Sequence, residues 1–143
     1  METFFTVLAG VLVFVIGQII VQVWLNPLQQ LKNAIVDVSE VLTKHEGTII
    51  SLAIAPLEAR KTVSQDMAIM AARLSGRREL IPFYAKARLL YTLPSQTNIQ
   101  EAIGSLNAIS NYVVGSHKNA GIIASYCNQE VRHALGLYVV VQI

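Results

Sequence analysis

The sequence predicts an all-α membrane protein, with one N-terminal transmembrane helix followed by a small cytoplasmic helical bundle whose first helix is coiled-coil-like. Three observations lead to this fold class. No charged residue lies between Glu2 and Lys32. Apolar residues recur at helical spacing along most of the remaining chain. Charged residues make up only 14% of the chain, and the mean hydropathy is +0.48. Ordinary soluble domains carry about 25% charged residues.

Composition excludes several classes of protein. The apolar content of 53% excludes intrinsic disorder. A net charge of +2 is too small to indicate a nucleic-acid partner. The single Cys127 excludes an intramolecular disulfide and fits a reducing compartment. The 143 residues allow one domain beside a membrane segment. We expect a transmembrane signal anchor over residues 1–26, a heptad-patterned helix over 27–56 and a small helical domain over 57–143.

The first element is the transmembrane segment, Phe4–Leu25. Its 22 residues would form a helix of roughly 33 Å, enough to cross a hydrocarbon core of about 30 Å. Aromatic residues stand at both ends, as in an interfacial belt. The segment lacks the basic start and the small-residue cleavage site of a signal peptide, so we expect a permanent anchor. All eleven basic residues follow it, which predicts an external N-terminus and a cytoplasmic body.

Polar and small residues interrupt this apolar segment. Gln18 and Gln22 are four residues apart and share one helix face. Gly10 and Gly17 belong to a row of residues on a neighbouring face: Thr6, Gly10, Val13, Gly17, Ile20 and Trp24. Small residues let helices approach closely in lipid, and an amide near mid-membrane needs a partner. We therefore expect helix–helix contact. The alternative is that Gln22 reaches toward the interface and that the helix simply tolerates the glycines.

The second element follows Asn26-Pro27, which predicts a helix restart because Asn can cap a helix and Pro is favoured in its first turn. The apolar residues of this helix have heptad spacing: Leu28, Leu31, Ile35, Val38, Leu42, then His45, Ile49 and Leu52. The spacing predicts either a coiled coil with another chain or an amphipathic helix on its own bundle. The dense Glu/Lys pairs of a dedicated zipper are absent, so both interpretations stay open. His45 could set register or titrate as a switch; the alternative is a merely tolerated histidine.

Four further helices are expected, over residues 63–74, 82–91, 98–114 and 116–135. Thr62 or Ser64 would cap the first, which would end near Gly76. Thr97 resembles the start of a capping box for the third, and Gly136 has the position expected of a residue that ends the last. Residues 137–143 are β-prone and uncharged, so we expect this end to pack against other parts of the protein.

The densest basic cluster is Arg73, Arg77 and Arg78. Such side chains could contact anionic lipid headgroups. Three charges are fewer than the roughly four to eight of a strong lipid-binding patch. The alternative is that they are the solvated ends of two helices.

One motif suggests chemistry. Glu130 and His133 are spaced i, i+3, as in di-iron bundles. Such a site needs a second motif and two more carboxylates, and this chain offers one motif with Glu79 and Glu101 as candidate partners. Cys127 lies six residues from His133, on a different side of the helix, so a Cys–His nucleophilic pair could form only through another element. We expect no catalytic residue, no cofactor and no enzymatic activity; a metal site shared between copies is the remote alternative.

These observations predict a non-enzymatic, single-pass membrane protein that acts through helix–helix association as an accessory or scaffolding subunit. Its expected partners are membrane lipid and either copies of itself or a larger membrane complex. The alternative is a homo-oligomeric pore or membrane-perturbing effector, with Gln18 and Gln22 around a lumen. A single span with a small helical body fits a bacterial inner membrane.

Overall fold

The structure is a computed structural model that describes residues 1–115 and 118–137. Every regular element within these ranges is helical, which confirms the all-helical class. The helix predicted over residues 116–135 begins at Ala120. Residues 116–117 and residues 138–143 of the β-prone end lie outside the described residues.

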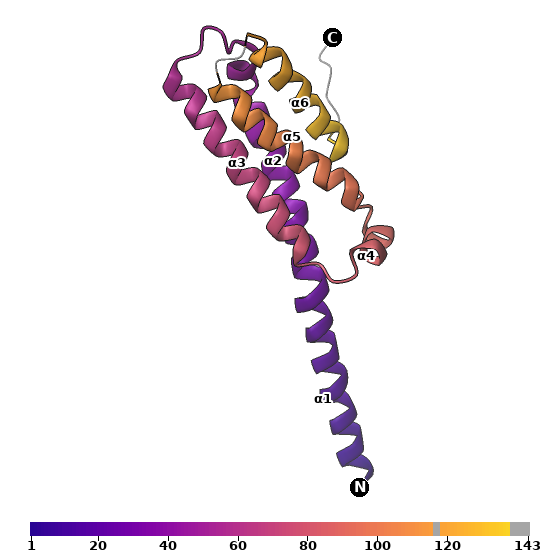
Figure 1. Ribbon diagram of the computed structural model, residues 1–143. Coiled ribbons are helices and arrows are strands. Elements are labelled where there is room, and N and C mark those ends of the chain that lie inside the picture. The colour runs from indigo at the N-terminus through magenta and orange to yellow at the C-terminus, as the bar shows by residue number, and fades with distance from the viewer. Residues whose placement is uncertain (116–117, 138–143) are drawn as a thin grey trace, which may run out of the picture.

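The chain begins with one continuous helix of 49 residues, Glu2–Ile50. It consists of α1 (Glu2–Ile20), a π-helical turn η1 (Val21–Leu25) and α2 (Asn26–Ile50). At 1.5 Å per residue it is roughly 74 Å long. Its N-terminal part is long and apolar enough to cross a membrane, by length and composition. Figure 1 shows α1 extending away from the other helices.

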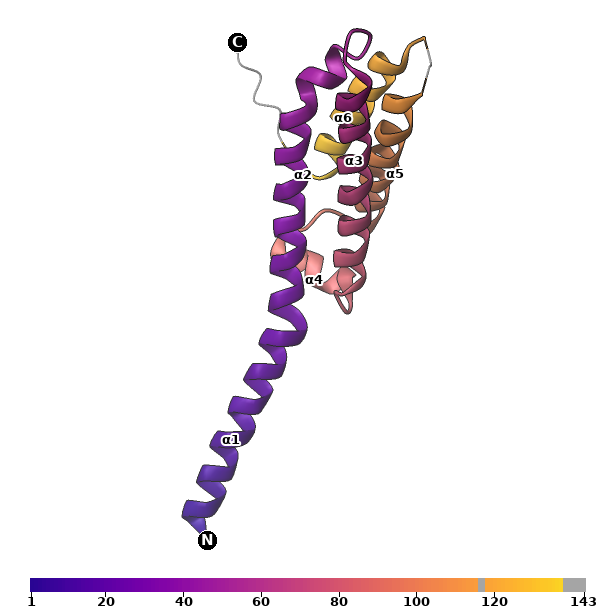
Figure 2. The same ribbon diagram turned by 90° about the vertical axis from the view of Figure 1, so that its left-hand side faces the viewer.

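The predicted helix restart at Asn26-Pro27 is wrong, because the helix continues through both residues. Pro27 lacks an N–H group, and in a regular α-helix its ring would crowd the carbonyl of Val23. The π-helical turn widens the helix just before the proline: the N–H of Asn26 donates to the carbonyl of Val21, five residues earlier. The wider turn relieves this conflict, and Figure 2 shows the helix axis bending there.

Four helices surround the core: α2, α3 (Leu57–Glu79), α5 (Gln96–Val114) and α6 (Ala120–Ala134). α3 lies between α2 and α5, and α6 packs against α5 and α2. Consecutive core helices run in opposite directions (Figure 1). The largest fully buried side chains come from all four helices: Leu31, Val38, Leu42, Ile49, Val63, Met67, Leu74, Ile99, Leu106, Ile109, Val113 and Val131.

The heptad row faces this core. Its eight residues, Leu28, Leu31, Ile35, Val38, Leu42, His45, Ile49 and Leu52, are all buried, with at most 9% of any one exposed. The structure therefore supports the amphipathic interpretation, in which the row packs against helices of its own chain. His45 is hydrogen-bonded within the bundle, since its Nε2 lies 2.6 Å from Oδ2 of Asp66 on α3. A seam with a second chain is not proposed further, because these side chains are not at the surface.

Two predicted boundaries of α3 are wrong. The helix begins at Leu57, six residues before the predicted start, because extended Pro56 (φ −60°, ψ 149°) already precedes the first turn. It also continues past Gly76 to Glu79. A glycine inside a helix costs only about 1 kcal/mol, and Leu74 beside it is fully buried in the core.

The remaining boundaries follow local chemistry. α4 (Tyr84–Tyr91) begins after Phe83, which is left-handed with φ 51°. Ser95, not Thr97, caps α5: its side chain accepts a hydrogen bond of 3.1 Å from the N–H of Asn98. Gly136 ends α6 as predicted, with φ +69°. The N–H groups of Gly136 and Leu137 donate back to the carbonyls of His133 and Arg132, which completes a Schellman motif.

Candidate functional site

The surface of α1 is the largest feature that the bundle leaves uncovered. None of its 19 residues is buried. Large apolar side chains point outward all around it, among them Val13 with 71% and Phe14 with 66% of their surface exposed. Only Glu2, in the first turn, is charged. The helix therefore presents an apolar surface without a partner in the described part of its own chain.

The predicted contact residues of α1 lie open on this surface. A Cβ atom added at Gly10 or Gly17 would meet no heavy atom within 4 Å. The side chains of Gln18 and Gln22 are exposed, and neither makes a hydrogen bond within the described part of the chain. Both faces are thus free to receive another helix, and the predicted helix–helix contact stays a prediction.

A short segment beside the base of α1 forms a second candidate site. We call residues 80–95, which link α3 to α5 and include α4, the α4 arm. Figures 1 and 2 show α4 at the end of the bundle from which α1 extends. The ring of Phe83 stacks on Trp24, with centroids 6.5 Å apart and planes at 23°. This contact ties the arm to the end of the apolar segment.

The arm is closed by a buried tyrosine. The hydroxyl of Tyr84 donates a 2.7 Å hydrogen bond to the carbonyl of Pro94, ten residues later. Burial raises the pKa of Tyr84 to about 12, although the charges of Arg88 and Arg78 act in the opposite direction. Tyr84 therefore stays neutral at physiological pH and can donate this bond.

Unusual backbone conformations flank α4. Phe83 and Thr92 both have φ 51°, and no other non-glycine residue in the described ranges has a positive φ. Such conformations cost on the order of 1–2 kcal/mol for residues with a side chain. They turn the chain sharply into and out of α4, so the short helix projects from the bundle.

The three arginines predicted to contact headgroups have different surroundings. Arg73 pairs with Asp37 of α2 at 3.2 Å. Arg77 donates a 2.6 Å hydrogen bond to the side chain of Gln30. Nη1 of Arg78 is buried and has no hydrogen-bond partner among the described residues. Two of the three therefore hold α3 against α2, which the sequence did not reveal.

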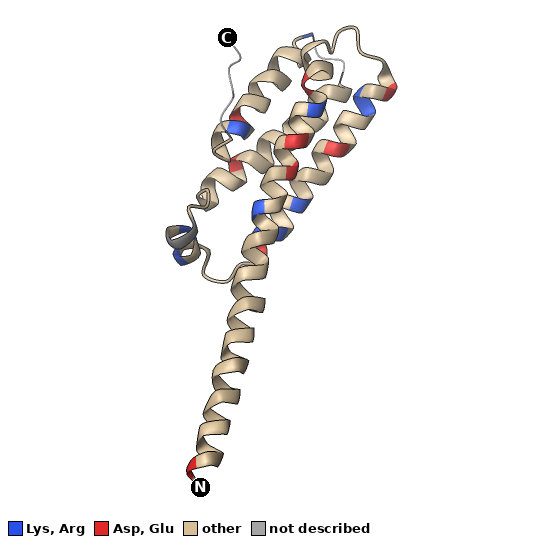
Figure 3. Ribbon diagram, turned by 180° about the vertical axis from the view of Figure 1, so that it is seen from behind, with Lys and Arg blue, Asp and Glu red and all other residues tan. Residues whose placement is uncertain are grey.

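Two further basic residues, Lys86 and Arg88, belong to the same end of the molecule and are exposed. Sequence reasoning missed them because they lie apart from the arginine cluster along the chain. A signal was present, since residues 70–100 contain five basic residues and one acidic residue. Figure 3 shows the basic residues of the α4 arm at this end of the bundle.

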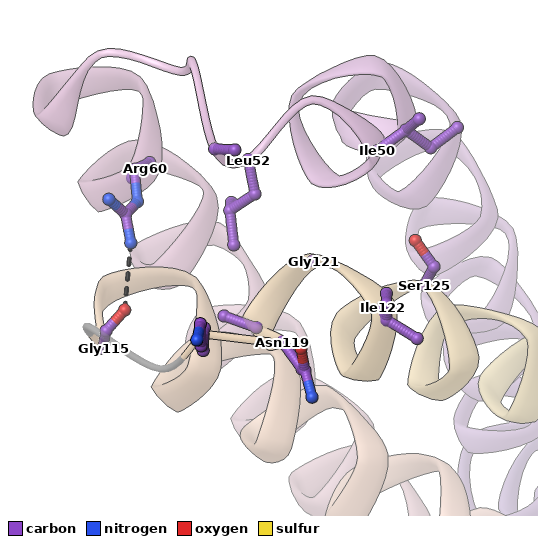
Figure 4. Close-up of a pocket in the computed structure, with 11 residues that line it drawn as sticks. Ile50, Leu52, Arg60, Gly115, Asn119, Gly121, Ile122 and Ser125 are labelled. Carbon is purple, nitrogen blue, oxygen red and sulfur yellow. Dashed lines mark hydrogen bonds between the residues drawn. The ribbon is translucent and has the colours of Figure 1, made fainter.

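The opposite end of the bundle contains an open hollow (Figure 4). Arg60 lies at its edge and donates from Nε to the carbonyl of Val113 at 2.7 Å and from Nη2 to that of Gly115 at 3.0 Å. These carbonyls end α5 and have no partner inside that helix. A cation at a helix C-terminus also interacts favourably with the helix dipole. Arg60 therefore caps the C-terminal end of α5 and joins α3 to α5 at the edge of the hollow.

Removing this cap should lower stability. We expect Arg60→Ala to reduce the free energy of unfolding by about 1.5–3 kcal/mol, the usual range for a charged hydrogen bond. Lys61→Ala is the matched control, because the pair that Lys61 makes with Glu58 is exposed. Urea unfolding of the full chain in detergent micelles, followed by circular dichroism, measures both. Equal midpoints for the two variants would contradict the capping role.

The Glu-x-x-His motif lines a separate hollow with Glu101 and Tyr126. Ser105 donates a 3.2 Å hydrogen bond to Glu130. No group of three His, Cys, Asp or Glu residues in the described ranges lies close enough together to hold a metal ion. Burial, with a smaller contribution from Glu130, raises the pKa of the Cys127 thiol. A protonated thiol is a poor nucleophile.

Searches against protein-family models, curated proteins and solved structures found no match to this chain. The features that remain for a functional argument are the exposed α1 helix, the two glutamines within it and the α4 arm.

Proposed function

We propose that the chain is a single-pass membrane protein in which α1 crosses the bilayer and the bundle lies in the cytoplasm. It acts as a non-enzymatic accessory or scaffolding subunit through helix–helix association. The observation that carries this proposal is the complete exposure of α1. Apolar surface in water costs about 25 cal/mol per Å², and a bilayer removes that cost. The helix also satisfies its own backbone hydrogen bonds, as a spanning segment must.

The association is assigned to α1 because its contact residues are open. Gly10 and Gly17 leave room for a second helix backbone, and Gln18 and Gln22 offer amides without partners in the described chain. Small residues and interhelical hydrogen bonds are the usual means of helix association in lipid. The heptad row of α2 takes no part, since it is buried in the bundle.

The orientation gives a direct test. All eleven basic residues follow α1, so the positive-inside rule places the C-terminus in the cytoplasm. In a bacterial inner membrane, alkaline phosphatase fused to the C-terminus should be inactive, because this enzyme matures only outside the cytoplasm. Green fluorescent protein at the same position should fluoresce. An active phosphatase with a dark fluorescent fusion would reverse the topology.

A homo-oligomeric pore or membrane-perturbing effector is the second candidate. It is favoured by one observation: Gln18 and Gln22 share a face and are unbonded in the described chain, as expected of residues around a polar lumen. Copy number separates the two functions. Native mass spectrometry of protein extracted gently from its own membrane should give heterologous partners for an accessory subunit and several identical copies for a pore.

A further inference from the structure

We infer that the α4 arm is a second membrane contact, which binds anionic phospholipid headgroups at the bilayer surface beside α1. The inference rests on the proposed insertion of α1. It goes further because it specifies which end of the bundle faces the membrane. The molecule would then be held at two places, by a spanning helix and by an interfacial segment.

The position of the arm is the first argument. The apolar segment ends at Leu25, and Trp24 is therefore at the depth of the bilayer interface, where tryptophan is enriched. Phe83 stacks on Trp24 at 6.5 Å, so the start of α4 lies at the same depth. Figures 1 and 2 agree in placing α4 at this end of the bundle.

The two faces of the arm are the second argument. Ile81, Tyr84 and Ala87 are buried and hold the arm to the bundle. Other residues of the arm expose large apolar side chains: 55% of Leu80, 71% of Phe83 and 90% of Leu89. At a bilayer surface they can enter the boundary between headgroups and acyl chains.

Charge is the third argument, and it selects the lipid. Lys86 and Arg88 lie exposed among these apolar residues, and Nζ of Lys86 is 5.8 Å from the Phe83 ring centroid. Residues 70–100 carry five basic residues and one acidic residue. Because Arg73 and Arg77 bond to α2, Lys86 and Arg88 are the exposed pair of this set that can contact anionic headgroups, which attract basic residues near a bilayer surface. The rest of the chain is slightly acidic, with six basic and eight acidic residues, so the excess positive charge lies within residues 70–100.

The test measures the depth of a nitroxide spin label on the full-length chain. Cys127→Ala removes the native thiol, and a label is then attached through Leu89→Cys, at a side chain that is 90% exposed. Ile122→Cys, on α6 and 73% exposed, is the control in water, and Val13→Cys, 71% exposed, reports on the span. The protein is reconstituted in vesicles of phosphatidylcholine, alone or mixed with phosphatidylglycerol. Collision rates with oxygen and with a water-soluble nickel complex give the depth of each label.

The inference predicts a ratio of oxygen to nickel collisions several-fold higher at residue 89 than at residue 122 in the mixed vesicles. The ratio at residue 89 should fall in phosphatidylcholine alone. It should also fall when Lys86→Gln and Arg88→Gln are combined, but not with Lys118→Gln, a control at the far end of the bundle.

Other outcomes overturn the inference in distinguishable ways. A label at residue 13 in the bilayer together with one at residue 89 in water would refute the α4 contact and leave the span intact. A label at residue 13 in water would refute the span and, with it, the inference. A label at residue 89 shielded only in native membranes, and not in vesicles of purified protein, would assign the arm to a protein partner instead of lipid.

Discussion

Replacing Leu31 by aspartate should unfold the helical bundle, whereas the same charge at Val36 should leave it folded. Leu31 has none of its surface exposed, and Val36, on the same helix, has 62% exposed. An unpaired carboxylate inside an apolar core lowers the free energy of unfolding on the order of 4 kcal/mol or more. Thermal unfolding and limited proteolysis of the full chain in detergent micelles measure the difference.

The same experiment tests the alternative that the heptad row contacts a second chain. A Leu31→Asp variant that keeps its unfolding temperature but loses a partner chain would show that the row is an intermolecular seam. The burial of Leu31 and Leu42 against α3 and α6 predicts the opposite. Loss of fold should precede any loss of association.

Gly10→Ile combined with Gly17→Ile should strongly reduce association in the membrane. A Cβ atom added at either glycine would meet nothing within 4 Å among the described residues, so the larger side chains should leave the bundle intact and act by holding another helix away. Gln18→Leu with Gln22→Leu should have a smaller effect, because interhelical polar contacts contribute only about 0.6–2 kcal/mol each. Cross-linking yields in native membranes give the comparison.

Ala9→Ile is the control for added bulk, since residue 9 lies on a third face of α1. If both double variants cross-link as well as the unmodified chain, α1 is only an anchor. Association would then depend on the outer surface of the bundle, and the proposed role of α1 would be wrong.

The sequence was sufficient to predict features that depend only on neighbouring residues. The C-terminal end of α6 is an example. Gly136 adopts φ +69° because a helix that ends in a left-handed residue favours glycine there. The helix restart predicted at Pro27 was wrong, although a proline after an asparagine usually starts a helix. A π-helical turn five residues long instead allows the helix to continue, and this solution leaves no simple mark in the sequence.

The heptad row shows a different kind of limit. The heptad spacing indicates that one face of α2 is apolar. A coiled coil or a four-helix bundle can cover such a face equally well. The decision depends on what α3 and α6 do, and those helices lie tens of residues away. The capping of α5 by Arg60 also depends on distant residues, because the arginine and the carbonyls of Val113 and Gly115 are more than fifty residues apart.

The sequence by itself determined that the chain is helical and that its N-terminal helix is long and apolar enough to cross a membrane, because both properties depend on neighbouring residues. Only the tertiary structure decided which helices cover the heptad row. It also decided that Arg73 and Arg77 bond to α2, and that Phe83 meets Trp24, 59 residues earlier. The physical reason is that periodicity gives the direction in which a side chain points, whereas its partner is set by how the whole chain packs.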